Sequence, residues 1–184
     1  MSARIERLNL VVVLAATMGM AVVASPAGLP FGAPPFSAAG ERKTAPDFAL
    51  TSANGEAISL SGYRGRVVLL DFWATWCTGC KVEIPWYMEF QNKYSRRGLT
   101  SVGAAMDDEG WQKVKPYLQE HPINYPIVLG NPGLVEPYQI TSLPVTLLID
   151  RNGKIADTHV GMVDKDRWER EIQQLLEEQP QTHR

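Results

Sequence analysis

The sequence predicts an α/β fold built around a central mixed sheet, because strand-like and helix-like patterns alternate along the chain. The apolar run 67–72 has the pattern of a strand that is buried on both faces. A helix-like stretch follows at 80–97 and stops at Gly98. Farther along, the runs 145–150 and 154–160 flank an Asn-Gly turn and predict an antiparallel hairpin. We therefore expect parallel and antiparallel strands in one sheet, with helices on both faces.

The remaining elements are expected where the same patterns recur. Strands are expected at 48–51, 57–59 and 100–106, helices at 111–120 and 165–177, and a short element at 127–129 before a turn at 134–138. The first two of these strands flank an Ala-Asn-Gly turn and predict an amino-terminal β-hairpin. Pro85 lacks a backbone N–H and is expected to kink the long helix near its start. The acidic residues 107–109 are interpreted as solvated charges of a loop or helix start.

The amino terminus has the pattern of an export signal. Two arginines precede an uncharged stretch, and small residues stand at the end of segment 1–24, where signal peptidase prefers them. That stretch is shorter than the ~20 residues that span a bilayer, although residues 8–27 could serve as an uncleaved membrane anchor. Prolines and glycines then recur through residues 25–44, which predicts a tether. We expect an exported protein, either soluble after cleavage or anchored to a membrane by residues 8–27.

Length and composition predict one folded domain and exclude some classes of partner. The chain has 184 residues, of which 45% are hydrophobic and 21% charged, and this is globular composition. We expect the domain at 45–178, followed by a polar tail at 179–184. The net charge is −2 and no basic stripe is present, so no nucleic-acid partner is predicted.

The two cysteines of the chain, Cys77 and Cys80, form a Cys-x-x-Cys motif directly after the central strand. A thiol at the start of the following helix is activated, because free N–H groups and the helix dipole favour the thiolate. The second thiol, one helical turn on, can then attack a mixed disulfide formed at the first. Half of a zinc site or two structural thiols are the alternatives. Zinc needs about four ligands, whereas His121, His159 and His183 are scattered singly, so we predict redox chemistry without a metal or cofactor.

Two segments of the chain resemble the thioredoxin superfamily. Residues 68–81 match its strand, active-site turn and helix start, and residues 142–150 match the segment that carries its cis-proline. Glu83, the lead-in 62–66 and a long segment between the second and third core strands are similar to the TlpA-like branch of exported bacterial redoxins. The resemblance covers about residues 45–178. It implies a thioredoxin-like fold with a redox-active disulfide between the two cysteines.

The resemblance also implies a client-binding surface. Pro144 matches the family's cis-proline, and the backbone of Leu143 would then pair with an extended client segment. The alternative is an ordinary trans proline that starts a strand. Trp76, Thr78 and Gly79 would complete the surface, whereas Trp73 and Trp86 are expected in the core. Because the dipeptide between the cysteines is Thr-Gly, unlike the Gly-Pro of cytosolic thioredoxin, the motif does not indicate the redox potential.

Two acids are expected to act on the resolving thiol. Asp71 interrupts the apolar strand and matches the buried carboxylate of thioredoxin, and Glu83 lies at i+3 from Cys80. A buried carboxylate holds its proton more readily than an exposed one, so both could exchange a proton with that thiol. The alternatives are an exposed helical charge for Glu83 and a packing role for Asp71.

The function that these features predict is a periplasmic thiol–disulfide oxidoreductase, chiefly a protein disulfide reductase. Its partners would be protein disulfide or dithiol clients and a membrane electron donor, and the resemblance implies a role in cytochrome c biogenesis. One alternative is a peroxiredoxin-like thiol peroxidase. Peroxiredoxins carry Pro-x-x-x-Thr-x-x-Cys, but Leu70 stands seven residues before Cys77. The other alternative is a copper-delivery module, for which His159 is the candidate distal ligand.

Overall fold

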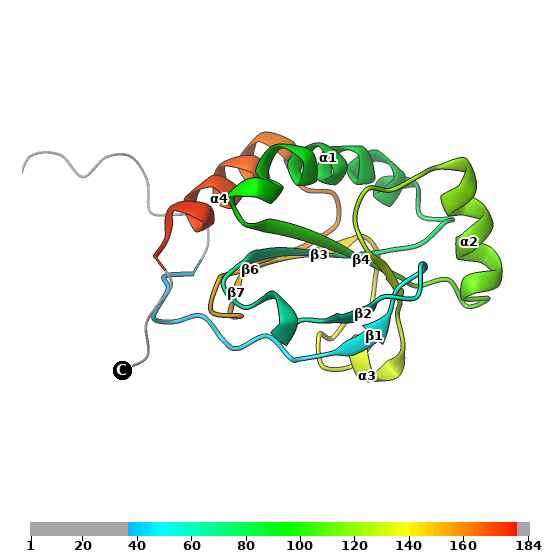
Figure 1. Ribbon diagram of the computed structural model, residues 1–184, viewed down its shortest axis with the longest axis horizontal. Helices are drawn as coiled ribbons and strands as arrows, with labels where there is room; N and C mark the ends of the chain where they lie inside the picture. The colour runs from blue at the N-terminus through cyan, green and yellow to red at the C-terminus, as the bar shows by residue number, and fades with distance from the viewer. Residues whose placement is uncertain (1–36, 180–184) are drawn as a thin grey trace, which may run out of the picture. The chain divides into compact units, whose positions relative to one another are not determined.

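A five-stranded mixed sheet forms the centre of the computed structural model, which describes residues 37–179 (Figure 1). Its strand order is β5-β4-β3-β6-β7, with β3 (Val67–Trp73), β4 (Leu99–Ala105), β5 (Ile127–Leu129), β6 (Val145–Ile149) and β7 (Ile155–Val160). Strands β3, β4 and β5 are parallel, whereas β6 and β7 are antiparallel to their neighbours. The mixed sheet that the sequence predicts is confirmed. The expected signal 1–24, most of the tether and nearly all of the tail lie outside the described residues.

Helices and a small hairpin surround the sheet (Figure 1). They are β1 (Ala49–Thr51), β2 (Ala57–Ser59), the 3₁₀ helix η1 (Ser61–Tyr63), α1 (Thr78–Tyr94), η2 (Ser95–Arg97), α2 (Trp111–Glu120), α3 (Pro132–Val135) and α4 (Lys165–Glu177). The β1–β2 hairpin is confirmed, and β2, β5, α2 and α4 have the expected bounds. Two expectations need correction. Helix α1 begins two residues early and gives way to a 3₁₀ turn before Gly98, and the expected turn at 134–138 overlaps α3.

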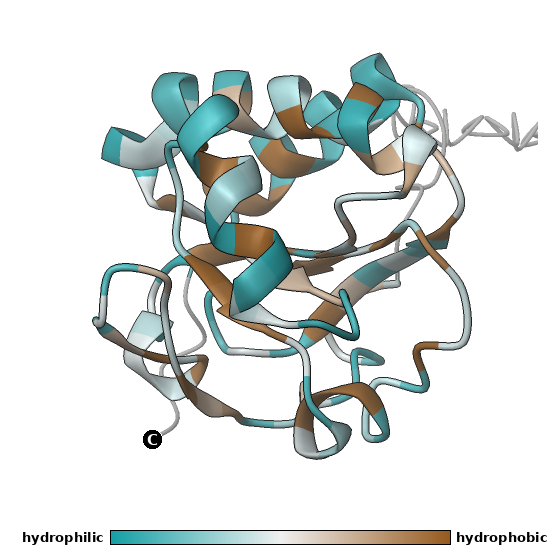
Figure 2. Ribbon diagram, turned by 90° about the vertical axis from the view of Figure 1, so that its right-hand side faces the viewer, coloured by the Kyte–Doolittle hydropathy of each residue, from teal (hydrophilic) through white to brown (hydrophobic). Residues whose placement is uncertain are grey.

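The side chains of β3 alternate between two apolar layers, which explains the unbroken apolar run. Val67, Leu69 and Trp73 belong to the layer that includes residues of α1, α2 and α4. Val68, Leu70 and Phe72 belong to the layer formed with the hairpin and α3. Figure 2 shows the matching pattern on the helices, where hydrophobic and hydrophilic stretches alternate. The alternation places Asp71 on the side of α1, the helix that carries Cys80 and Glu83.

The chain itself covers both edges of the sheet. At the β5 edge, Ala53 of the hairpin donates its N–H to the carbonyl of Ile127 at 2.9 Å. At the β7 edge, Ile155 donates its N–H to the carbonyl of Lys43 at 2.8 Å, and Ser37 donates to Ala156 at 3.3 Å. Among residues 37–179, no helix combines the length and apolar character needed to cross a membrane.

Candidate active site

Cys77 occupies the amino-terminal cap of α1. Its backbone is extended, with φ −77° and ψ 108°, and its Sγ accepts the N–H of Cys80 at 3.2 Å. A cap position brings the thiol next to free N–H groups and the positive end of the helix dipole, which favour the thiolate when the pair is reduced. Thr78 and Gly79 form the first turn of the helix. The chain therefore folds locally in the way that the motif predicts for an activated thiol.

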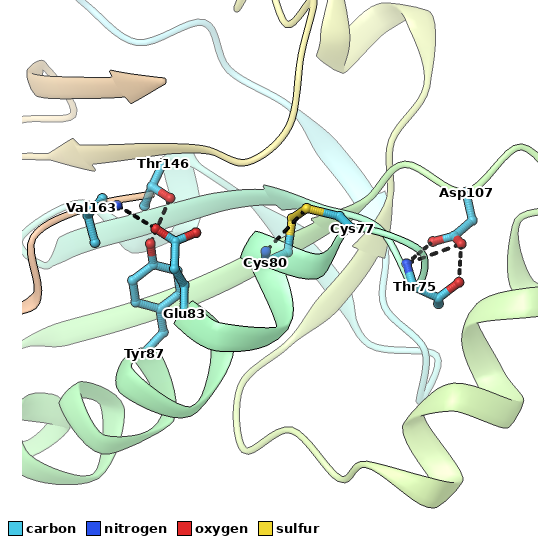
Figure 3. The surroundings of a disulfide bond; sticks show 8 residues. All are labelled: Thr75, Cys77, Cys80, Glu83, Tyr87, Asp107, Thr146 and Val163. Atoms are coloured by element: carbon cyan, nitrogen blue, oxygen red, sulfur yellow. Dashed lines mark hydrogen bonds between the residues drawn. A yellow bond between two sulfur atoms is a disulfide. The ribbon is translucent and has the colours of Figure 1, made fainter. Parts of the chain in front are cut away.

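Cys77 and Cys80 form a disulfide bond, with 5.4 Å between their Cα atoms (Figure 3). Cys77 is 6% exposed, whereas Cys80 is fully buried. A client can therefore approach only the first sulfur, and the second is confined to the interior, where it can reach its neighbour. This asymmetry agrees with the expected order of attack and resolution.

The turn before Cys77 is fixed by an acid that the sequence analysis misplaced. Asp107, two residues after the end of β4, is 6% exposed and accepts the backbone N–H of Thr75 at 3.0 Å. It also accepts the hydroxyl of Thr75 (Figure 3). The interpretation of Asp107 as a solvated charge is therefore wrong. The signal that could have found it is its place after a parallel strand, since such strands end at one edge of a sheet.

The cis-proline loop lies against the cysteine loop. The Leu143–Pro144 bond is cis, so the trans alternative is wrong. A Cβ atom placed on Gly79 would lie 3.5 Å from Cδ of Pro144 and 3.2 Å from Cγ of Met162. Gly161, next to Met162, donates its N–H to the carbonyl of Pro144 at 2.9 Å. Three loops far apart in the sequence therefore meet at the disulfide, and Met162 is a member that the sequence analysis missed.

Asp71 is a buried carboxyl group with no hydrogen-bond partner among the described residues. It is 1% exposed, and neither Oδ1 nor Oδ2 has a partner within that part of the chain. Burial raises the pKa of Asp71 well above its usual range, and the charge of Glu83 raises it further. A carboxyl group in this state keeps its proton until a strong demand for it arises.

Glu83 is fully buried on the same side of the sheet, so the exposed-charge alternative for it is wrong. Its Oε1 accepts the backbone N–H of Val163 at 2.7 Å, and Oε2 has no partner in the described structure. Figure 3 shows its carboxylate turned toward Val163 and Tyr87. Burial raises the pKa of Glu83, and the Val163 N–H partly opposes this. Its interaction with the Cys80 thiol stays a prediction.

Comparison with known proteins identifies the family. The model of the AhpC/TSA family matches residues 42–158. Thioredoxin-like protein YneN of Bacillus subtilis is 32% identical over 133 residues, which are 72% of this chain and 78% of that protein. Thiol-disulfide oxidoreductase ResA of Geobacillus kaustophilus is 35% identical over 133 residues, 72% and 76% of the two chains. The chain belongs to the thioredoxin superfamily, as a TlpA-like member matched by the AhpC/TSA model.

A solved structure supports the same assignment. The crystal structure of a thiol:disulfide interchange protein of the thioredoxin family from Chlorobium tepidum has a TM-score of 0.68 and 30% identity to this chain. It matches 73% of this chain and 97% of that one. This TlpA-like protein is therefore a thiol–disulfide oxidoreductase with a Cys77–Cys80 redox pair.

Exposed apolar side chains surround the disulfide of this TlpA-like protein. Trp76, directly before Cys77, is 64% exposed, as expected, and Met162 is 50% exposed. Trp73 is fully buried and Trp86 is partly buried against the core, also as expected. Surface hollows of about 610 and 530 Å³ lie elsewhere, and the residues lining them include none of those predicted to bind a client. The exposed side chains of Trp76 and Met162 thus form an apolar rim beside the disulfide.

The candidate copper ligand has other contacts in this TlpA-like protein. The Nε2 atom of His159 lies 3.0 Å from the carbonyl oxygen of Met162, and its ring packs on Trp168 with centroids 6.0 Å apart. No group of three or more His, Cys, Asp or Glu residues within 37–179 is placed to hold a metal ion. The contacts of His159 therefore give no support to the copper-delivery alternative.

Proposed function

We propose that this thiol–disulfide oxidoreductase acts chiefly as a protein disulfide reductase in the bacterial periplasm. The observation that carries the proposal is the asymmetry of the pair: Cys77 caps the helix and keeps 6% of its surface exposed, whereas Cys80 is fully buried. Only the first thiol can meet a client, and only the second can release it.

In the proposed cycle, the Cys77 thiolate attacks a client disulfide, and the first client sulfur leaves as a thiolate. Cys80 then loses its proton to the Asp71–Glu83 pair and attacks the Cys77 sulfur. The client leaves with both of its sulfurs reduced, and the enzyme holds the disulfide. A dithiol donor in the membrane returns two electrons to the pair, and the stored proton goes back to Cys80. Electrons and protons therefore balance over one turnover.

The proposed clients are extended protein segments that contain a disulfide. The exposed side chains of Trp76 and Met162 offer apolar contact beside Cys77, and the backbone of Leu143 can pair with a strand of any sequence. Thr78 and Gly79 would lie under the client segment. We include cytochrome c apoproteins among the clients, since their Cys-x-x-Cys-His sites must be reduced before haem attachment.

The proposed organisation assigns residues 1–24 to export, or residues 8–27 to an inner-membrane anchor. Residues 25–44 would form a tether, 45–178 the catalytic domain and 179–184 a tail. Cell fractionation with amino-terminal sequencing of the mature protein tests this arrangement. A cytoplasmic protein with an intact amino terminus would contradict it.

Client trapping in cells tests the order of the cysteines. We expect the Cys80→Ser variant to accumulate mixed disulfides with clients, because nothing resolves the bond at Cys77. The Cys77→Ser variant should trap none, and the double Ser variant gives the background. Equal trapping by both single variants would contradict the assignment. A peroxide-consumption assay on the wild-type protein separates this function from a thiol peroxidase, and we expect no consumption.

A further inference from the structure

Buried polar atoms without partners gather on the α1 side of the sheet. Both carboxylate oxygens of Asp71, the indole Nε1 of Trp73 and the hydroxyl of Tyr125 have no hydrogen-bond partner within residues 37–179. Tyr125 is 5% exposed and comes from the segment before β5. Buried polar groups are nearly always paired, so such a group calls for an explanation.

The strand register brings these three residues together. Asp71 on β3 is paired with Gly103 on β4, and in a parallel pair the two positions face the same side. A Cβ atom on Gly103 would lie 3.0 Å from Nε1 of Trp73 and 3.3 Å from Cε2 of Tyr125. The missing side chain at Gly103 therefore lets the tyrosine ring and the indole N–H lie over the strand next to Asp71.

We propose that Tyr125 is a positioning residue that acts through Asp71, donating its hydroxyl hydrogen bond to the Asp71 carboxylate when that carboxylate ionises. The inference rests on the proposed function, in which Asp71 takes a proton from Cys80. Trp73 supplies a second donor to the same carboxylate. In this proposal, the effect of both residues reaches the reaction through the proton affinity of Asp71.

The hydrogen-bonding capacities of the three groups are complementary. A phenol and an indole donate, and an ionised carboxylate only accepts. Burial and the charge of Glu83 hold Asp71 in its protonated form, which cannot take a proton from a thiol. Hydrogen-bond donors stabilise the ionised carboxylate and therefore lower the pKa of Asp71. Tyr125 and Trp73 thus make Asp71 a usable proton acceptor at a site that otherwise opposes its charge.

The other titratable groups around Asp71 lie on the elements that pack against it. Helix α1 contributes Glu83 and Tyr87, whose hydroxyl is bonded to Thr146 of β6. Besides burial, the charge of Tyr117 on α2 raises the pKa of Tyr125, and the charge of His159 on β7 partly offsets the rise that burial causes in the pKa of Glu83. Replacing Tyr125 leaves all of these groups in place, so a change in the Asp71 titration can be assigned to the lost hydroxyl.

The direct test is the Tyr125→Phe variant in its disulfide form, in which the cysteines do not titrate. The carboxyl carbon of Asp71 is followed by NMR against pH and assigned with Asp71→Asn. We expect its pKa to rise by about one unit, because the ionised form loses a donor. Tyr138→Phe is the matched control, since the Tyr138 hydroxyl donates to Pro46 at 2.7 Å in the opposite layer. This control should leave the Asp71 titration unchanged.

Kinetics and a second variant complete the test. Single-turnover release of client from the mixed disulfide should be several-fold slower near neutral pH in Tyr125→Phe, with its pH midpoint moved upward. Trp73→Phe should shift the Asp71 pKa in the same direction, and it keeps the test open if the first variant fails to fold. An unchanged Asp71 titration in the folded variants would overturn the inference. An Asp71→Asn variant with normal client release would instead overturn the proposed function of Asp71.

Discussion

Two buried aspartates, one within β3 and one directly after the neighbouring strand β6, have opposite surroundings. Asp150, directly after β6, is 3% exposed and accepts Nη1 of Arg42 at 3.0 Å. It also accepts the N–H groups of Asn152 and Lys154, each at 2.9 Å. Asp71, in the middle of β3, is equally buried, and no partner for its carboxylate exists among the described residues. The first acid is compensated and the second is not.

The difference distinguishes an acid that joins segments of the fold from the acid that we propose takes part in the reaction. A buried carboxylate costs free energy unless donors or a cation compensate it. At Asp150 this cost is offset, and Arg42 also bonds to Glu178, so the contact joins the amino-terminal segment, β6 and the residue after α4. At Asp71 the cost is retained, and uncompensated acids of this kind cluster at functional sites.

The largest expected effect is on the compensated acid. We expect Arg42→Met to destabilise the fold by about 3–5 kcal/mol, because it leaves the Asp150 charge buried without its cation. Denaturant unfolding measures the change, and Arg170→Met, an exposed arginine of α4, is the control. Activity per folded molecule should stay at the wild-type level. A loss below that of the control would mean that Asp150 is compensated by backbone donors alone.

The next effect has the opposite sign. The raised pKa of Asp71 means that the wild-type protein loses stability as the pH rises from the ordinary aspartate range toward the pKa in the fold. Asp71→Asn removes this loss, so we expect about 1–3 kcal/mol of added stability at alkaline pH and convergence with the wild type in acid. Urea unfolding from pH 4 to 9 measures both curves. Asp150→Asn should be destabilised over the same range, and parallel behaviour of the two variants would refute the comparison.

A smaller effect is expected on kinetics. Glu83→Gln should slow client release from the mixed disulfide about tenfold near neutral pH, equivalent to about 1.4 kcal/mol in the barrier. It should also lower the apparent pKa of the reduced cysteine pair, because a negative carboxylate opposes a nearby thiolate. Thiolate absorbance against pH and single-turnover rates report the two effects. Combination with Asp71→Asn should be less than additive, since the two titrations are coupled. Strict additivity would mean that the acids act separately.

The smallest expected effect is at the outer partner of Arg42. The Glu178 side chain is 35% exposed, so its ion pair with Arg42 at 2.6 Å is screened by solvent. We expect Glu178→Gln to cost less than about 1 kcal/mol in denaturant unfolding. A loss as large as that of Arg42→Met would mean that Arg42 stabilises the fold mainly through Glu178 and not through Asp150.

Local patterns predicted the elements and the reactive residues well, because their signals lie within a few positions of one another. The apolar run of β3 and the Cys-x-x-Cys spacing were sufficient to place Cys77 and Cys80, whereas the resemblance to the thioredoxin superfamily identified Pro144. Asp71 was visible because a charge interrupts an apolar strand. The inferences on the two cysteines and on Asp71 need only neighbouring residues and the periodicity of the element.

The partners of the buried acids could not be predicted, because packing alone decides them. Glu83 meets the N–H of Val163 from 80 positions away, and Arg42 meets Asp150 from 108 positions away. The burial of Asp107 depends on Thr75, in the loop that follows the neighbouring strand. Tyr125 reaches the Asp71 region only because a glycine faces that acid in the β3–β4 register. A single sequence carries no local signal for such contacts.

The covered edges of the sheet bear on self-association. An open edge strand is a template for pairing with another copy of the same chain and so for aggregation. Here the hairpin blocks β5, and residues 37–44 block the start of β7. The proposed function gives the protein a docking edge at Leu143 for extended clients, and open outer strands would add a second place for chains to pair. The covered β5 edge and the covered start of β7 reduce the open backbone with which another copy of the chain could pair.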